Sequence, residues 1–186
     1  MQFQKEGMET NGEALQIEAA KRDPARFGPL YERYFGDIFR FLARRTAREA
    51  DAADLAQQTF LKAMLALPRY RDQGAPFRAW LYRIALNEVR MYWRSSKGRV
   101  YMDLGLAETL QLMQDAELPN GEEDLRALET ALGRLREAPA ALIEMRYFDG
   151  MSFAEIGQVL GISEDAAKMR THRVLGALRS SLERKA

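Results

Sequence analysis

Apolar side chains recur at helical spacing along most of the chain. The first stripe follows Asp23 and Pro24, an N-cap residue and a first-turn proline that together favour a helix start. Two more stripes occupy residues 52–67 and 76–99, with a loop over residues 68–74 between them. Because no segment shows a sustained alternation of apolar and polar positions, we predict an all-α fold without a sheet.

Helical spacing is lost over residues 100–123, where glycine, proline and asparagine stand among acidic side chains. Farther along, Ser152 and Ser163 each precede a helical stripe as an N-cap, and Gly161 lies in the short turn between the two stripes. This order is typical of a helix-turn-helix. We therefore predict two small helical domains, residues 13–99 and 124–186, joined by a flexible acidic linker, residues 100–123.

The charge of the chain is balanced only in total. The chain carries 28 Lys and Arg side chains against 27 Asp and Glu, for a formal net charge of +1. The balance is +6 over residues 1–100, −6 over residues 101–128 and +1 over residues 129–186. Near-neutrality is therefore a cancellation between unlike segments, and it does not argue against a nucleic-acid partner.

Composition excludes several kinds of site. The chain has no cysteine and one histidine, so it cannot form a disulfide, a thiolate zinc site or a histidine metal cluster, and we predict no metal site. No apolar run approaches the roughly 18–20 residues that span a bilayer, and residues 1–12 lack the apolar core of a signal peptide. We expect a soluble intracellular protein without membrane insertion. An enzyme is the least favoured class, because there is no Gly-rich phosphate loop and little catalytic chemistry to assemble.

The predicted helix after Ser163 carries cations on its outer face, namely Lys168, Arg170 and Arg173, together with His172. A helix that enters a major groove needs cations for phosphates and polar tips for base edges. The same pattern also fits a pair of helices with a solvated basic face, in which His172 is an ordinary surface residue. DNA binding is the interpretation we prefer for this helix.

The helix predicted from Pro76 has one apolar face and one polar face. The polar face carries Arg83, Asn87, Arg90 and Arg94, at spacings of four, three and four residues. This face places cations along one line, as contacts with successive phosphates require.

Aromatic side chains interleave with these cations. Exposed aromatic rings stack on unpaired bases, so the combination favours a single strand over a closed duplex. The alternative is that the rings belong to the core, which we expect for Trp80. Tyr92 and Trp93, at the more basic end of the helix, are left open between the two positions.

Two linked motifs resemble a known family. The segments DAADLAQQTFLKA (residues 51–63) and FRAWLYRIALN (residues 77–87) resemble region 2 of bacterial RNA polymerase sigma factors. Residues 152–182, preceded by Met151, resemble region 4. The linker joins the two directly, which is the layout of the extracytoplasmic-function class. The resemblance implies a promoter-specificity subunit that has no catalytic site and no cofactor.

The resemblance also implies where core polymerase binds. In the family, the second helix of region 2 docks on a coiled coil of the beta-prime subunit. The matching positions in this chain are Asp54, Leu55, Gln57, Gln58 and Leu61. Family members usually have an acidic residue where this chain has Gln58.

The remaining site residues follow from the same resemblance. The loop with Tyr70 and Arg71, together with Asn87, corresponds to a pocket that captures a flipped base of the minus-ten element, with Arg90 and Arg94 on phosphates. The full set of minus-ten candidates is Tyr70, Arg71, Arg83, Asn87, Arg90, Tyr92, Trp93 and Arg94. The minus-thirty-five candidates are Lys168, Met169, Arg170, His172 and Arg173.

As a sigma factor, the chain is expected to bind the beta-prime and beta subunits of core polymerase, promoter DNA and an anti-sigma protein. It would act in the cytoplasm and associate with the nucleoid through polymerase. The principal alternative is a helix-turn-helix regulator that binds duplex DNA without being a polymerase subunit. That alternative explains residues 152–184 and leaves the aromatic, basic helix from Pro76 without a role. A helical adaptor without DNA affinity is a further alternative.

Overall fold

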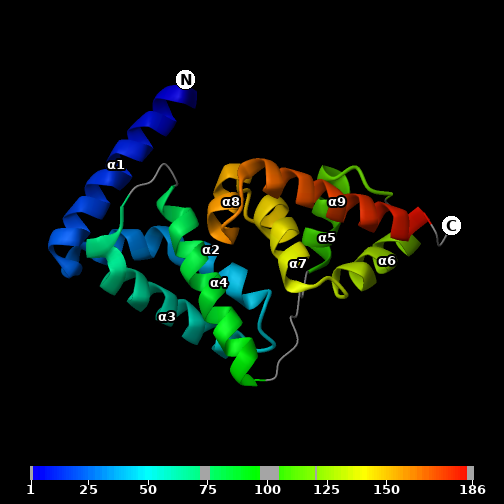
Figure 1. Ribbon diagram of the computed structural model, residues 1–186, viewed down its shortest axis with the longest axis horizontal. Helices are drawn as coiled ribbons and strands as arrows, with labels where there is room; N and C mark the ends of the chain where they lie inside the picture. Colours follow the sequence, from blue (N-terminus) through cyan, green and yellow to red (C-terminus); the bar gives the residue numbers. More distant parts are fainter. Residues whose placement is uncertain (1, 72–75, 97–104, 120, 184–186) are drawn as a thin grey trace.

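The computed structural model describes residues 2–71, 76–96, 105–119 and 121–183, apart from the side chains of residues 2–11 and 96. Every element in these ranges is helical, and none is a strand, which confirms the predicted all-α fold. Figure 1 shows the elements in two halves, with α1 to α4 on one side and α5 to α9 on the other. The helices are α1 (Gln2–Arg22), α2 (Gly28–Ala43), α3 (Glu49–Ala66), α4 (Phe77–Ser96), α5 (Leu106–Asp115), α6 (Glu122–Leu132), α7 (Glu137–Ile143), α8 (Phe153–Leu160) and α9 (Glu164–Glu183). Three shorter turns are η1 (Pro24–Phe27), η2 (Leu67–Arg69) and the π-helical η3 (Glu144–Phe148).

The N-terminal half, residues 2–96, is built around the apolar stripes that the sequence shows. Asp23 caps η1 by accepting a hydrogen bond from the Ala25 backbone N–H at 3.0 Å, as its place before Pro24 predicts. Helices α2, α3 and α4 then pack on one another, and their buried faces include Phe41 and Phe60. Together they hold α3 and α4 in a fixed relation, which positions the surfaces described below.

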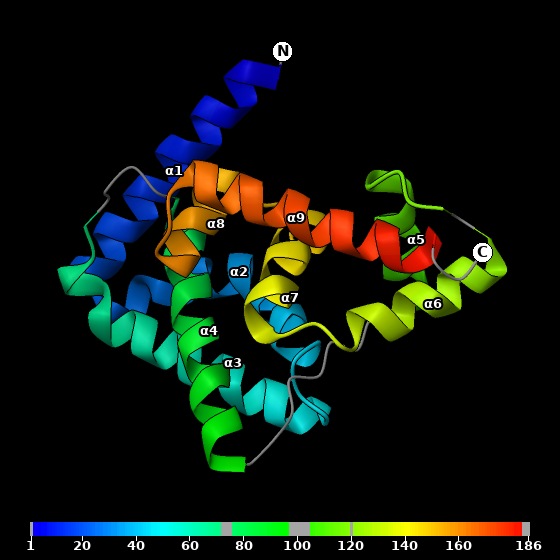
Figure 2. The ribbon, with the colours of Figure 1, turned by 45° about the vertical axis from the view of Figure 1, so that its right-hand side comes forward.

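Helix α1 is an addition to the elements that the sequence pattern predicted. Its first turns project beyond the rest of the molecule in both ribbon views (Figure 1 and Figure 2). The C-terminal part packs on the N-terminal half, where Ile17 and Ala20 are buried and Glu13 accepts a hydrogen bond from the Tyr34 hydroxyl. With only two buried apolar residues in its described part, this helix has a weak apolar stripe, and the pattern did not reveal it.

The C-terminal half, residues 105–183, encloses a second core. Helix α5 lies inside the segment predicted as the linker, and its Leu112 and Met113 are buried against α6 and α9. Residues 105–119 therefore pack with the C-terminal half, whereas residues 100–104 and 120 of the predicted linker lie outside the described residues. The three-part division of the chain remains a prediction.

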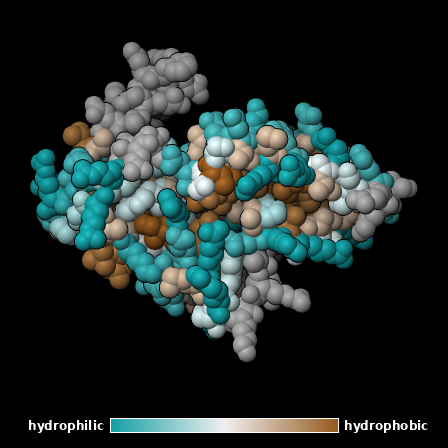
Figure 3. Space-filling view, viewed as in Figure 1, coloured by the Kyte–Doolittle hydropathy of each residue, from teal (hydrophilic) through white to brown (hydrophobic). Residues whose placement is uncertain are grey.

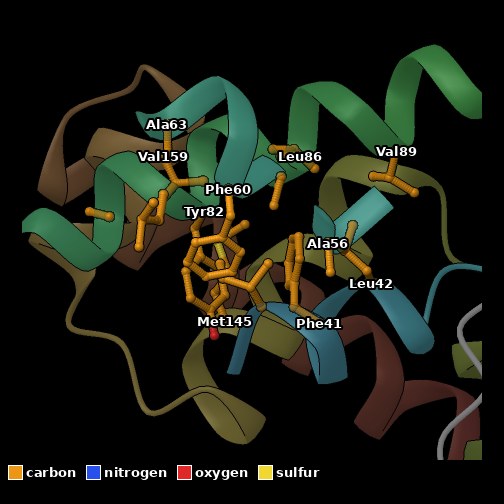
Figure 4. Close-up of a cluster of buried hydrophobic side chains, with 14 of the residues drawn as sticks. Phe41, Leu42, Ala56, Phe60, Ala63, Tyr82, Leu86, Val89, Met145 and Val159 are labelled. Carbon is orange, nitrogen blue, oxygen red and sulfur yellow. The ribbon is translucent and has the colours of Figure 1, made fainter. Parts of the chain in front are cut away.

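The two halves share one apolar core. Figure 4 shows Phe41 and Tyr82 of the N-terminal half beside Met145 and Val159 of the C-terminal half. In both ribbon views α4 runs next to α8, and the two helices are in contact (Figure 1 and Figure 2). In the described parts of the chain, the two halves are therefore in direct apolar contact.

Helices α8 and α9 form the predicted helix-turn-helix. Ser152 and Glu155 make a reciprocal capping box at the start of α8, with distances of 2.8 and 3.2 Å. Gly161 ends α8 in the left-handed region at φ +69°, where a glycine is favoured. Gly157 allows the two helices to approach, because a Cβ at this position would lie 2.7 Å from the Ile162 carbonyl oxygen. Sequence pattern and structure agree on this motif.

Candidate protein and nucleic-acid interfaces

One face of α3 presents polar and apolar side chains to solvent. The predicted polymerase-contacting residues Asp54, Gln57, Gln58 and Leu61 are all exposed, and their spacing of three, four and seven residues puts them on one face. Leu65 lies one turn after Leu61 and continues the same face. It was not among the residues predicted from the sequence, although its spacing of four residues from Leu61 was a signal. The exposed fractions of Leu61 and Leu65 are 53% and 70%. The two exposed leucines lie one helical turn apart and form a small apolar patch on this face.

The prediction for Leu55 needs correction. Its side chain is only 5% exposed and belongs to the core, as its place on the apolar stripe of residues 52–67 indicates. An ion pair joins this part of α3 to α4, because the Lys62 ammonium pairs with both carboxylate oxygens of the buried Glu88 at 2.7 Å.

We call the residues Asp54, Gln57, Gln58, Leu61 and Leu65 the α3 face. Figure 3 shows an apolar patch at the edge of the N-terminal half, over the C-terminal part of α3.

The predicted polar face of α4 is present. Arg83, Asn87 and Arg94 are exposed, and Arg90 is half-buried on the same side of the helix. The Arg90 guanidinium is occupied within the chain, since it donates to the Glu137 carboxylate of α7 at 2.5 Å. Three of the four members of this face are thus open to a ligand, and the fourth is paired across the two halves.

Tyr70 lies beside the start of this face. Its ring is 4.8 Å from the ring of Trp80 and 5.4 Å from that of Phe77, with the Lys21 ammonium 5.5 Å from its centre. Trp80 is half-buried and packs on the core, as we expected. Because Arg83 and Asn87 follow Trp80 by three and seven residues, Tyr70 lies at the same end of the helix face as these two residues. Arg71, next to Tyr70, is exposed.

Tyr92 and Trp93, two of the minus-ten candidates, make contacts inside the protein. Trp93 is 9% exposed, packs in the core and donates its indole N–H to the Arg45 carbonyl oxygen at 3.0 Å, so it presents no ring face to a strand in this arrangement. Tyr92 is half-buried and donates its hydroxyl to Asp51 at 2.8 Å. Hydrogen bonds from Arg48 and from Tyr92 hold the pKa of Asp51 below its usual value. Both aromatic residues therefore belong to the packing of α4 on α3 and α2.

A pocket of about 450 Å³ opens at the basic end of α4. It is lined by Arg90, Trp93 and Arg94 of the N-terminal half and by Glu137 of the C-terminal half. The pocket marks the seam between the two halves.

The outer face of α9 carries the predicted duplex-contacting residues. Lys168, Met169, Arg170, His172 and Arg173 are all exposed, and Met169 is 64% exposed. The opposite side of α9 packs into the protein and holds the helix in place. Its buried residues are Ala167, Thr171, Leu178 and Leu182. The arrangement thus offers three charged side chains and one imidazole on a single helix surface, with the geometry that a major groove accepts.

Within the described residues, no group of three or more His, Asp or Glu side chains is placed to hold a metal ion. A search of the same residues finds no helix long and apolar enough to cross a membrane.

Family models and curated relatives cover both halves of the chain. Residues 30–99 match the Sigma-70 region 2 family, and residues 125–178 match the Sigma-70 region 4 family. The sigma factor SigL of Mycobacterium tuberculosis is 30% identical over 165 residues, which are 89% of this chain and 93% of SigL. The chain belongs to the extracytoplasmic-function sigma factors. This confirms the resemblance seen in the sequence.

Other members of the family show how far the likeness extends. BldN of Streptomyces coelicolor is 31% identical over 159 residues, and this chain spans 58% of its length. SigW of Bacillus subtilis is 29% identical over 172 residues, covering 87% of this chain and 91% of SigW.

Solved structures resemble the fold. The structure of CnrH in complex with the cytosolic domain of CnrY has a TM-score of 0.63 and 27% identity, and the match covers 92% of this chain and 97% of that one. The sigma factor RpoE, crystallised with the anti-sigma factor NepR from Bartonella quintana, has a TM-score of 0.59 at 20% identity, covering 84% and 96% of the two chains. The second likeness concerns the fold alone.

Proposed function

We propose that this sigma factor binds core RNA polymerase, recognises a promoter, assists strand opening and so directs transcription initiation. The observation that carries the proposal is the pair of family matches, region 2 over residues 30–99 and region 4 over residues 125–178, in the order that sigma factors have. Sigma factors are not enzymes, and the chain is assigned the role of a specificity subunit. We infer that it acts in the cytoplasm and associates with the nucleoid through polymerase.

In this proposal the three exposed surfaces have separate tasks. The α3 face docks on the beta-prime subunit, with Leu61 and Leu65 as apolar anchors and the amides and the carboxylate around them as polar contacts. The α4 residues Arg83, Asn87 and Arg94 contact the opened minus-ten strand near Tyr70 and Arg71. The outer face of α9 reads the minus-thirty-five duplex, with contacts to the beta subunit as a further part of the assembly.

The region 2 match favours this function over a regulator that binds closed duplex. A regulator of that kind accounts for α8 and α9 but leaves the match over residues 30–99 and the exposed polar face of α4 without a role. The two functions differ in a simple observation. A regulator binds a promoter fragment tightly by itself, whereas a sigma factor does so only with polymerase.

We infer in addition that an anti-sigma protein controls this chain. The support is that CnrH and RpoE are described as complexes with partner proteins, and NepR is described as an anti-sigma factor. An α3 face with two exposed leucines offers such a partner an apolar site.

In vitro transcription with purified core polymerase over a library of genomic promoters tests the function. We expect initiation at a defined set of promoters only when the chain is present. Folded chain that supports no initiation at any promoter would contradict the proposal.

A further inference from the structure

Arginines of the N-terminal half meet carboxylates of the C-terminal half along the whole seam. Arg44 and Arg45 follow α2, whereas Arg78 and Arg90 lie on α4. Every one of them has an acidic partner in the C-terminal half, although the two chain segments are separated by at least 47 residues. The contacts are Arg44 with Glu144 and Asp149, Arg45 with Glu144, Arg78 with Glu155 and with the Asp149 carbonyl oxygen, and Arg90 with Glu137.

Four of these side chains form a buried charge cluster, defined by Arg44, Arg45, Glu144 and Asp149. Their exposed side-chain fractions are 8%, 2%, 1% and 4%. Arg44 donates to the Asp149 carboxylate at 2.7 Å and lies 3.4 Å from Glu144, while Arg45 pairs with the other oxygen of Glu144. The Arg45 guanidinium also stacks on Phe41, 3.8 Å from the ring centre. The cluster therefore exists only while the two halves are in contact.

The hydrogen bonding of the cluster is incomplete. Asp149 Oδ2 is buried without a hydrogen bond, and Arg44 Nε, Arg45 Nη2 and Glu144 Oε1 contribute to the cluster through ion pairs rather than through well-aligned hydrogen bonds. Burial of charge costs free energy that ion pairing offsets fully only with good geometry and complete hydrogen bonding. A seam of this kind specifies one arrangement of the halves but does not lock them, because the charges regain their hydration on separation.

The proposed function requires such a separation. By their names, the minus-ten and minus-thirty-five elements lie about 25 base pairs apart, or about 85 Å of straight duplex at roughly 34 Å per ten base pairs. A compact chain of this length has a radius of gyration of about 16 Å, so the closed body is too small to span both elements at once. In addition, Glu137 occupies Arg90 on the α4 face as long as the halves are in contact.

We propose that the buried charge cluster and the Arg90–Glu137 pair form an autoinhibitory latch, which holds the free chain closed and must open before the two halves reach their promoter elements. That opening permits promoter binding rests on the proposed function, whereas the closed state itself is a property of the free chain. The apolar part of the seam stabilises the closed state by burying Met145 and Val159 against Phe41 and Tyr82. The charged side chains determine the orientation of the two halves, and they allow the seam to open because they are hydrated again on separation.

Distances between two spin labels test the latch in the full-length chain. The chain has no cysteine of its own. Cysteines introduced by Glu32→Cys and Glu129→Cys, both at exposed positions, are therefore the only sites at which the labels react. We expect one short, narrow distance in the free chain and a longer one on core polymerase. A free chain that shows only the long distance overturns the latch, whether or not the same chain initiates transcription. Failure of initiation instead overturns the proposed function and leaves the distance result standing.

Substitutions on the C-terminal side of the seam show whether the charges hold it. Glu137→Gln with Asp149→Asn keeps the shapes and removes two partners of buried or half-buried arginines, so we expect the open fraction to rise roughly tenfold or more. The matched control is Glu122→Gln with Glu123→Gln, two exposed acids of α6 with the same change in net charge. An open fraction equal in both variants overturns the proposal.

A charge exchange separates opening from misfolding. Glu137→Arg alone places two cations together and should open the seam, whereas Arg90→Glu with Glu137→Arg restores the pair in reverse and should recover the short distance. If the double variant stays as open as the single one while its helix content is unchanged, the pair does not act as part of a latch.

Discussion

Arg44 donates a hydrogen bond to the Asp149 carboxylate at 2.7 Å, across 105 residues of sequence. The pair joins the end of α2 to the segment just before the helix-turn-helix, so a contact between two charged side chains fixes how the two family regions lie on each other. Because both side chains are almost fully buried, loss of either one leaves the numbers of buried cations and anions in the seam unequal. The halves that match region 2 and region 4 are thereby coupled in the free chain.

Asn87→Ala should impair strand opening more than polymerase binding. Asn87 is exposed on the α4 face, and its amide is suited to the edge of an unpaired base. We expect a loss of about 1–3 kcal/mol in open-complex formation, which is roughly five- to 150-fold. Permanganate reactivity of the promoter measures opening, and titration with labelled core polymerase measures binding. An equal loss in both assays would indicate a folding defect instead.

Leu61→Gln with Leu65→Gln should weaken binding to core polymerase by about tenfold or more, because burial of one leucine is worth about 1.5–3 kcal/mol. Both side chains are exposed in the free chain, so the thermal unfolding temperature should change little. The control is Leu110→Gln on α5, a leucine that is 47% exposed and outside the α3 face. Equal effects of the two variants on affinity would remove the α3 face as the docking surface.

Lys168→Ala should weaken upstream promoter binding of the holoenzyme and reduce its dependence on salt. Each phosphate contact contributes about 0.9 to the slope of log K against log salt concentration, so the slope should fall by about one. Arg126→Ala is the control, since Arg126 is an exposed cation of the C-terminal half that pairs with Glu122 on α6. An unchanged slope for Lys168→Ala would place this side chain away from the DNA.

The local elements were predictable because their signals are local. Ser152, Gly157 and Gly161 each have a steric or hydrogen-bonding reason for their place, and the helix-turn-helix follows from them. The position of Trp93, which the sequence left open, had a signal too. Trp93 follows Val89 by four residues and so continues the buried stripe of α4, although its surroundings are basic.

The contacts across the seam had no such signal. Nothing in the sequence pattern relates Arg90 to Glu137 or Arg44 to Asp149, because residues so far apart meet only through the arrangement of the two halves. The −6 charge of residues 101–128 favours the interpretation of this segment as a linker. In the structure, α5 of that segment packs with the C-terminal half, and the acids that hold the arginines lie farther along the chain.

Gly157→Ala should destabilise the helix-turn-helix. The added methyl carbon would lie 2.7 Å from the Ile162 carbonyl oxygen, which is backbone and cannot move aside without shifting the turn. We expect a loss of about 1–3 kcal/mol in the free energy of unfolding, measured by urea denaturation. Gly176→Ala, on the open side of α9, is the control and should have a small or favourable effect. If both alanines are tolerated equally, α8 and α9 approach less closely than described.

Opening of the seam should increase as pH rises toward 7. Burial raises the pKa of Glu144 to about 7 from 4.5, with Arg45 and Arg44 opposing the shift and Asp149 adding to it. In the open state the carboxyl regains its ordinary pKa, so closure takes up a proton between these two values. The closed state is therefore strongest at the acidic end of this window, weakens as pH rises through it and levels off above it. The distance between spin labels at positions 32 and 129, measured against pH, gives the open fraction. In the Glu144→Gln variant the plot of open fraction against pH should be flatter, because the amide binds no proton. A wild-type curve that runs in the opposite direction, or one that Glu144→Gln leaves unchanged, would show that Glu144 does not control the seam.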